Sequence, residues 1–155
     1  CAGVLVCATI TRVVRGKTDV VMMLNGALGG LVAITAEPLM PTPLMAIIIG
    51  GIGGALVFAG TELLTAMKID DVVGAIPVHL IAGVWGTLAV PITNPDTSFG
   101  TQFLGTASIC VFVFVVSIII WGIMKATIGI RISEEAEKEG TDVAETGVIA
   151  YSIRD

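Results

Sequence analysis

Long apolar stretches separated by short polar connections dominate the chain. Four of the five stretches reach or approach the roughly 17–25 residues that cross a bilayer as a helix. The first is shorter, and we interpret it as the tail of a helix whose beginning is missing from this chain. We therefore predict an all-α membrane protein with helices over about 1–14, 20–36, 43–67, 72–93 and 103–129.

The basic residues divide the connections between these helices into two groups. The connections 37–42 and 94–102 contain no lysine or arginine. All eight basic residues lie in the other connections or at and after the last helix: Arg12, Arg15, Lys17, Lys68, Lys125, Arg131, Lys138 and Arg154. Basic connections stay on the cytoplasmic side. We predict a multi-pass protein of the cell (inner) membrane, with the start of the chain outside and the C-terminus in the cytoplasm.

Composition supports a location in the lipid bilayer. Hydrophobic residues make up 55% of the chain, charged residues 14%, and the mean hydropathy is +0.98. A soluble domain has about 25% charged residues. The net charge of −5 comes mostly from the C-terminal end, so we expect a lipid bilayer around the protein and no nucleic-acid partner.

Small residues recur at helical spacing within the apolar stretches. Gly26 and Gly30 are four apart, as are Gly50 and Gly54. In lipid this spacing lets helix backbones approach and pack by dispersion. A similar series follows in 72–93: Ala75, Ala82, Gly83, Gly86 and Ala89. We expect a tight helix bundle.

The composition changes to polar in residues 131–155, which are too few for a domain. Ser133 can cap a short helix that Gly140 ends, and Asp142 with Glu145 resembles a second cap. Two interpretations stay open: a solvated or disordered tail, and a docked regulatory segment. In the second, Arg131 and Lys138 could pair with Asp70 or Asp71.

His79 is the only histidine, and it lies in an apolar helix. Asp70 and Asp71 are the expected helix caps. Counting from them, His79 lies about eight residues in, or roughly 12 Å along the axis, close to the middle of a 30 Å hydrocarbon core. We expect Pro77 to bend the helix locally.

An ionisable side chain at that depth suggests a function. The alternative is a structural histidine bonded to neighbouring helices. If it is functional, the imidazole should face a cavity on the side that carries Ala75, Ala82 and Gly86. Glu62 lies near the end of the preceding helix, where it could reach Lys68 or the membrane surface.

We find no residue set that predicts catalysis. The chain has no Ser/His/Asp set, no paired carboxylates within the membrane and no phosphate loop. Cys1, Cys7 and Cys110 lack the C-x-x-C spacing of a zinc site, and we expect them to be buried as small hydrophobes. We predict that the protein is not an enzyme and holds no cofactor or metal.

Three segments resemble the ammonium transporter (Amt/Mep/Rh) family. They are "LNGALGGLVAITA" (24–36), "KIDDVVGAIPVHLIAGVWGTLAV" (68–90) and "MKATIGIRISEEAEKEGTDVAETGVIAY" (124–151). The likeness covers essentially the whole chain in the right order. It corresponds to the C-terminal portion of a family member, from the end of the seventh helix onward, and is closest to cyanobacterial-type bacterial members.

The resemblance implies a fold and a pore. Family members have eleven helices in two inverted repeats plus a last peripheral helix, and they assemble as trimers. Two histidines meet at the centre of each pore, and the likeness places His79 as the second. It also implies that Ala75 and Ile76 line the inner side below it, and that Leu28 faces the pore.

The resemblance also implies partners. The substrate would be ammonium or ammonia, the full-length protein would be a homotrimer, and a PII-type signalling protein could bind the cytoplasmic face. The tail, with Arg131, Gly140 and Asp142, would be regulatory.

Three functional hypotheses remain at this point. The first is the C-terminal part of an ammonium transporter, as a fragment or an incomplete gene product. The second is a membrane ammonium sensor module, since similar membrane domains occur fused to signalling domains. The third is a half-length membrane protein that does not transport.

Overall fold

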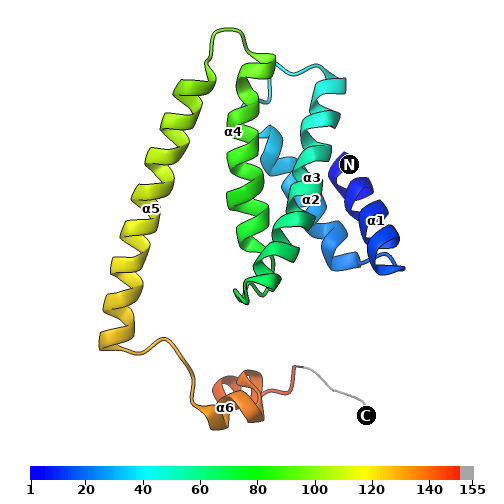
Figure 1. Cartoon of the computed structure of the whole chain (residues 1–155). Helices are drawn as coiled ribbons and strands as arrows, with labels where there is room; N and C mark the ends of the chain where they lie inside the picture. The colour runs from blue at the N-terminus through cyan, green and yellow to red at the C-terminus, as the bar shows by residue number, and fades with distance from the viewer. Residues whose placement is uncertain (151–155) are drawn as a thin grey trace. The chain divides into compact units, whose positions relative to one another are not determined.

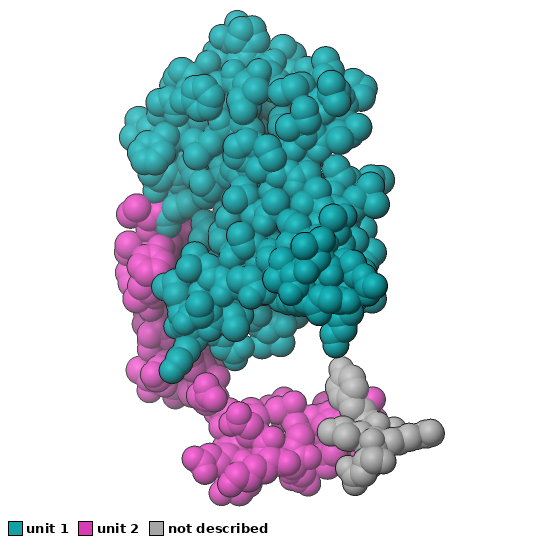
Figure 2. Space-filling model, turned by 45° about the vertical axis from the view of Figure 1, so that its right-hand side comes forward, with its two compact units in different colours: residues 1–110 teal, residues 111–155 magenta. Residues whose placement is uncertain are grey.

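The computed structural model describes residues 1–150, so residues 151–155 of the expected tail, with Arg154, lie outside the description. It divides into two compact units, one of residues 1–110 and one from residue 111 onward (Figure 2). The described residues form helices and loops without a strand. The elements are α1 (Ala2–Arg15), α2 (Val20–Ile34), α3 (Pro43–Ala66), η1 (Ile76–Ile81), α4 (Ala82–Thr93), α5 (Phe99–Thr127), α6 (Glu134–Glu139) and η2 (Asp142–Thr146).

Three described helical segments are long and apolar enough to cross a membrane. They are Pro43–Ala66, Ile76–Thr93 and Phe99–Thr127. The expected helix over 20–36 is the 15-residue apolar helix α2, which ends at Ile34. The expected helix over 72–93 begins only at Ile76. The all-helical fold is confirmed. Of the four long spans that we expected, three are long enough to cross a membrane, and the fourth is a shorter apolar helix.

Glycines bring α1, α2 and α3 together in the first unit (Figure 1). A Cβ atom on Gly26 would lie 2.6 Å from Gly3 O and from Cys7 Sγ. A Cβ on Gly54 would lie 2.6 Å from Gly3 Cα and from Gly3 O. The helices approach so closely that backbone meets backbone, which is how small residues promote packing in lipid. The tight bundle predicted from glycine spacing is confirmed.

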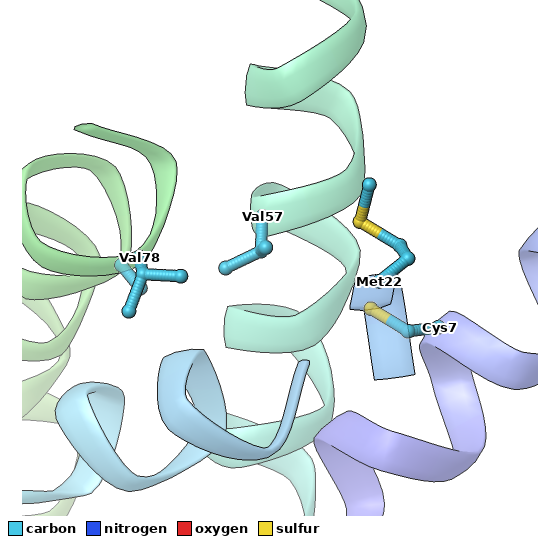
Figure 3. Packing of buried hydrophobic residues seen from close by; sticks show 5 residues of the cluster. Cys7, Met22, Val57 and Val78 are labelled. Atoms are coloured by element: carbon cyan, nitrogen blue, oxygen red, sulfur yellow. The ribbon is translucent and has the colours of Figure 1, made fainter. Parts of the chain in front are cut away.

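The buried core joins the same helices to the segment that carries His79. Cys7, Met22, Val57, Val78 and Ala82 form one apolar cluster, and Figure 3 shows several of these side chains pointing into the space between their helices. The Cys7 thiol donates to Gly54 O over 3.1 Å. Cys7 is buried as expected, but Cys1 is exposed and Cys110 half-buried. The expectation that all three cysteines are buried is therefore wrong for Cys1 and Cys110.

A charged cluster closes one end of the first unit. Arg15 pairs with Asp19 at 2.7 Å and with Glu62, and its guanidinium lies 5.4 Å from the centre of the Phe58 ring. The hydrogen bond that Arg15 donates to Glu62 raises the pKa of the Arg15 guanidinium. Glu62 therefore reaches Arg15, 47 residues away, and not Lys68. The reason is that α1 and α3 pack side by side through their glycines.

The connections without basic residues meet at one end of the first unit. Asn94 Nδ2 donates to Glu37 Oε2 over 2.9 Å. This bond joins the connection after α2 to the one after α4. It agrees with the sequence prediction that both lie on the same side of the membrane.

The second unit begins within α5 and contains α6 and η2. Ser133 Oγ accepts from Ala136 N over 3.2 Å, and Gly140 ends α6 with a φ of 105°, so the predicted cap and stop are confirmed. The second predicted cap is wrong. Thr141 precedes η2, and the Asp142 carboxylate accepts from Ala150 N over 2.8 Å, because the chain turns back toward it.

Candidate functional site around His79

The segment that carries His79 starts later than its apolar pattern predicts. Asp71 Oδ1 accepts from Ala75 N and Asp71 Oδ2 from Ile76 N, both over 2.8 Å. Gly74 has a φ of 78°, a left-handed conformation that glycine adopts freely. The carboxylate therefore reaches past a turn at 72–74 to cap the helix, and the capping role of Asp71 is confirmed. Asp70, its exposed neighbour, caps no amide of this helix.

The late start changes the position of His79 along its helix. His79 lies three residues after Ile76, about 4.5 Å along the axis at 1.5 Å per residue. The premise that eight helical residues precede it is wrong. Its position near the middle of the bilayer stays a prediction.

A wide turn sets the direction of the His79 side chain. Within Ile76–Ile81 the hydrogen bonds follow the π pattern, and Ala82 N–H donates to Pro77 O. Such turns hold one more residue than an α-turn and are frequent at functional sites. Val78 is 2% exposed and takes the buried position. His79 is exposed beside it.

The expectation that His79 shares a face with Ala82 and Gly86 is wrong. Ala82 is fully buried in the core, and a Cβ on Gly86 would lie 2.5 Å from Ala33 O. Val78, four residues before Ala82, lies on this buried face, and the extra residue of the wide turn turns the imidazole away from it. Pro77 lies within this wide turn, and the expected local bend of the helix stays a prediction.

His79 opens into a groove of about 320 Å³ within the first unit. On one side of the groove are residues of η1 and α4, and on the other are residues of the first half of α5. The lining residues are His79, Leu80, Gly83, Val84, Thr87, Gln102, Gly105, Thr106, Ile109 and Cys110. The groove is mostly apolar, with one imidazole, one amide and two hydroxyls, and it could hold a small polar molecule beside His79.

The other predicted pore residues are exposed but do not line this groove. Leu28 is 47% exposed and Ile76 36% exposed, and Ala75 is exposed as well. The structure thus brings His79 together with Gly83 and Thr87, not with these three. Their place in a pore stays a prediction.

Asn25 is a positioning residue that the sequence analysis missed. Its Nδ2 donates to Val73 O over 3.0 Å and would lie 2.5 Å from a Cβ on Gly74. It therefore holds the turn before His79 against α2. The signal was an amide within an otherwise apolar helix, which calls for a partner because an unpaired polar group is costly in lipid.

A second cavity, of about 350 Å³, lies between the end of α3 and the start of η1. Its polar lining includes Lys68, Asp70 and Asp71. No group of three or more histidine, cysteine or acidic residues that could hold a metal occurs within residues 1–150. An imidazole can donate and accept hydrogen bonds and exchange a proton, and this is the chemistry that His79 offers to the groove.

These features define the class of protein. Long apolar helices pack through glycine, and large apolar side chains remain exposed along them, as on α5, none of whose residues is buried. Such surfaces are stable against lipid. The chain is a multi-pass α-helical membrane protein.

Comparison with known proteins identifies the family. The profile of the Ammonium Transporter Family matches residues 1–151. Ammonium transporter Amt2 of Archaeoglobus fulgidus is 36% identical over 171 residues, covering 97% of this chain. A putative ammonium transporter of Synechocystis sp. is 38% identical over 135 residues, covering 86% of this chain. The chain belongs to the Ammonium Transporter Family.

A solved structure named "Sensor Amt Protein" has the same fold. It matches 93% of this chain with a TM-score of 0.84 and 31% sequence identity. The matched part is 38% of that structure's chain, 36% of Amt2 and 30% of the Synechocystis protein. The chain thus spans about a third of the length of the relatives it matches.

Proposed function

We propose that this chain is the C-terminal membrane part of a transporter that moves ammonium or ammonia through a hydrophobic pore containing His79. The observation that carries the proposal is the family match over residues 1–151, together with relatives that are named ammonium transporters. Ammonium is the proposed substrate, and the proposed reaction is transport without a covalent step.

In this proposal His79 exchanges hydrogen bonds and a proton with the substrate. A neutral imidazole can accept from one nitrogen and donate from the other, so it can bind ammonia and pass on a proton. Its exposure in a mostly apolar groove supports this role. Leu28, Ala75 and Ile76 line the path in the intact protein, and their exposure supports this assignment.

The proposal extends to assembly and location. The full-length protein forms a homotrimer in the cell (inner) membrane, with a cytoplasmic C-terminus. The alternation of basic connections supports this orientation. The tail, including Arg131, Gly140 and Asp142, regulates transport and offers a PII-type signalling protein a surface at the cytoplasmic face.

The experiment compares His79→Ala with the unchanged full-length product of the gene. Uptake of labelled methylammonium and the current carried by ammonium are measured on the same proteoliposomes. His79→Ala should assemble normally but change the ratio of current to uptake, because a methyl group neither binds ammonia nor passes a proton. Ile92→Ala is the control, since Ile92 is exposed on α4 and does not line the groove.

Two results would count against the proposal. Uptake and current that both match the unchanged protein after His79→Ala would exclude the relay role. Absence of uptake by the unchanged full-length protein would exclude transport.

A membrane ammonium sensor is the second candidate. The match to the structure named "Sensor Amt Protein" favours it. A sensor would bind ammonium in the same proteoliposomes without net uptake or current, so the transport assay separates the two functions.

A further inference from the structure

Lys68 ends α3 in a backbone conformation that glycine usually adopts. Its φ is 57°, and it is the one residue other than glycine with a positive φ among residues 1–150. Lys68 N donates to Thr65 O over 3.0 Å, and Ile69 N donates to Leu64 O over 2.9 Å. This is the hydrogen-bond pattern of a helix end closed by a left-handed residue. A lysine there costs stability because its Cβ crowds the backbone, so we looked for a role of its side chain.

The side chain of Lys68 lines the second cavity, which we call the Lys68 cavity. Its volume of about 350 Å³ is within the range of about 300–1,000 Å³ that is usual for small-molecule sites. Asp70 lines the same cavity. Both side chains are exposed, and neither takes part in an ion pair among residues 1–150. One cation and one anion thus border the same space without neutralising each other.

The rest of the lining leaves Asp70 as the acid available to a ligand. Both oxygens of the Asp71 carboxylate accept from amides of the following helix. The hydroxyls of Thr61 and Thr65 each donate to the carbonyl four residues earlier, so their oxygens can still accept a hydrogen bond. The Lys68 cavity therefore offers one free ammonium, one free carboxylate and two hydroxyl acceptors.

The length of α3 places the Lys68 cavity at the depth of lipid headgroups. This helix has 24 residues, or about 36 Å at 1.5 Å per residue, and the hydrocarbon core is only about 30 Å thick. The cavity lies at the C-terminal end of α3. In the last turns of the same helix, Leu63 is 56% exposed and Met67 58% exposed. Polar groups of both charges thus adjoin an apolar surface at the membrane boundary.

We propose that the Lys68 cavity binds a phosphoethanolamine group, carried by a phospholipid or free in solution. The ammonium of Lys68 donates to the phosphate. The ammonium of the ligand donates to the Asp70 carboxylate and to the hydroxyl oxygens of Thr61 and Thr65. A ligand with only one charge would leave Lys68 or Asp70 unpaired. This binding is reversible, and it does not depend on the proposed transport.

The test measures lipid binding to the full-length product of the gene in detergent. A ligand that binds only the folded protein raises the midpoint of thermal unfolding. The measured quantity is the lipid concentration that gives half of the maximal rise. Phosphatidylethanolamine and phosphatidylglycerol are compared in mixed micelles, because the second keeps the phosphate and lacks the ammonium. The unchanged protein should require less phosphatidylethanolamine than phosphatidylglycerol.

Three variants assign the two charges. Lys68→Gln should raise the half-maximal concentration of both lipids by about two- to fivefold, the usual effect of an exposed charge contact. Asp70→Asn should raise it by a similar factor for phosphatidylethanolamine only. Lys17→Gln is the matched control, because Lys17 is also an exposed lysine in a polar connection and does not line the cavity. It should bind both lipids like the unchanged protein.

Lys68→Gly separates loss of binding from loss of folding. Glycine adopts the left-handed conformation freely, so this variant should raise the midpoint without lipid and still bind both lipids as weakly as Lys68→Gln. A lower midpoint without lipid would contradict the cost of lysine at this position. An unchanged response to lipid would contradict its role in binding.

Dissolved O-phosphoethanolamine distinguishes the two sources of the ligand. If it raises the midpoint of the unchanged protein and Asp70→Asn weakens the effect, the ligand is a free zwitterion. If only the lipid acts, the ligand is a headgroup. Equal half-maximal concentrations of the two lipids, or Lys68→Gln behaving like Lys17→Gln, would overturn the proposal. A full-length protein without uptake would exclude the transport function and leave these comparisons unaffected.

Discussion

Gly54→Ala tests the packing that holds the first unit together. The new Cβ would lie 2.6 Å from both Gly3 Cα and Gly3 O, whereas ordinary contacts begin near 3.4 Å. These are backbone atoms, so no side chain can rotate away. α1 and α3 would have to separate by about 0.8 Å, which weakens dispersion contacts along the whole interface.

The expected magnitude combines two opposing effects. Overpacking a filled site costs typically about 1–3 kcal/mol, and a backbone clash belongs at the upper end of that range. Replacing glycine by alanine within a helix stabilises it by about 1 kcal/mol. Gly54→Ala should therefore lower the free energy of unfolding by about 2 kcal/mol.

Gly51→Ala is the matched control, one turn earlier on α3. Its Cβ would lie 3.7 Å from Ala2 Cβ and Val6 Cγ2, which is ordinary contact. This variant should be stabilised by up to about 1 kcal/mol. Equilibrium unfolding in mixed detergent micelles should thus separate the two variants by about 3 kcal/mol. Equal stabilities, or a more stable Gly54→Ala, would refute close packing of α1 on α3 at Gly3.

Three further predictions follow from the contacts described. Asp71→Ala should lower the free energy of unfolding by about 1–2 kcal/mol because it removes a helix cap. Asp70→Ala should change this free energy by less than about 0.5 kcal/mol. Equal effects of the two variants would contradict the cap at Ala75 and Ile76. A double-mutant cycle with Arg15→Ala and Glu62→Ala should give a coupling free energy below about 1 kcal/mol that decreases as salt is added, because the two side chains are 33% and 49% exposed. A large coupling free energy that does not depend on salt would contradict a surface ion pair. Truncation after Gly129 should leave the membrane bundle folded, because the buried core ends at Val90, yet deregulate transport; unchanged uptake and nitrogen response would leave the tail without a regulatory role.

The packing of the bundle could be predicted from the sequence because it depends on residue size at fixed spacing. Gly26 and Gly30 are four residues apart in one helix, and Gly50 and Gly54 in the next. In lipid little besides close packing favours glycine at this spacing. The partner of Gly54 could not be predicted, since Gly3 belongs to the short first stretch. For the same reason the sequence indicates only Lys68 or the membrane surface for Glu62, and not Arg15, which the glycine contact brings within reach.

The face of His79 could not be predicted because it depends on hydrogen-bond register. An α-helical count from His79 leads to Ala82 and Gly86, both small and suited to line a cavity. Composition does not reveal that Ala82 N–H donates to Pro77 O, one residue further back than in an α-helix. That single change of register turns His79 away from the face of Ala82, while Val78, four residues before Ala82, lies on it.

The same register explains why a conspicuous histidine and an inconspicuous threonine belong to one groove. Val78 fills the core and His79, the next residue, lies at the surface of the bundle, where Gly83 and Thr87 continue its face. The groove on that side is bounded by α5, whose Thr106 looks like one of many small residues in an apolar run. The two side chains share this groove because the buried position in the wide turn belongs to Val78 and not to His79.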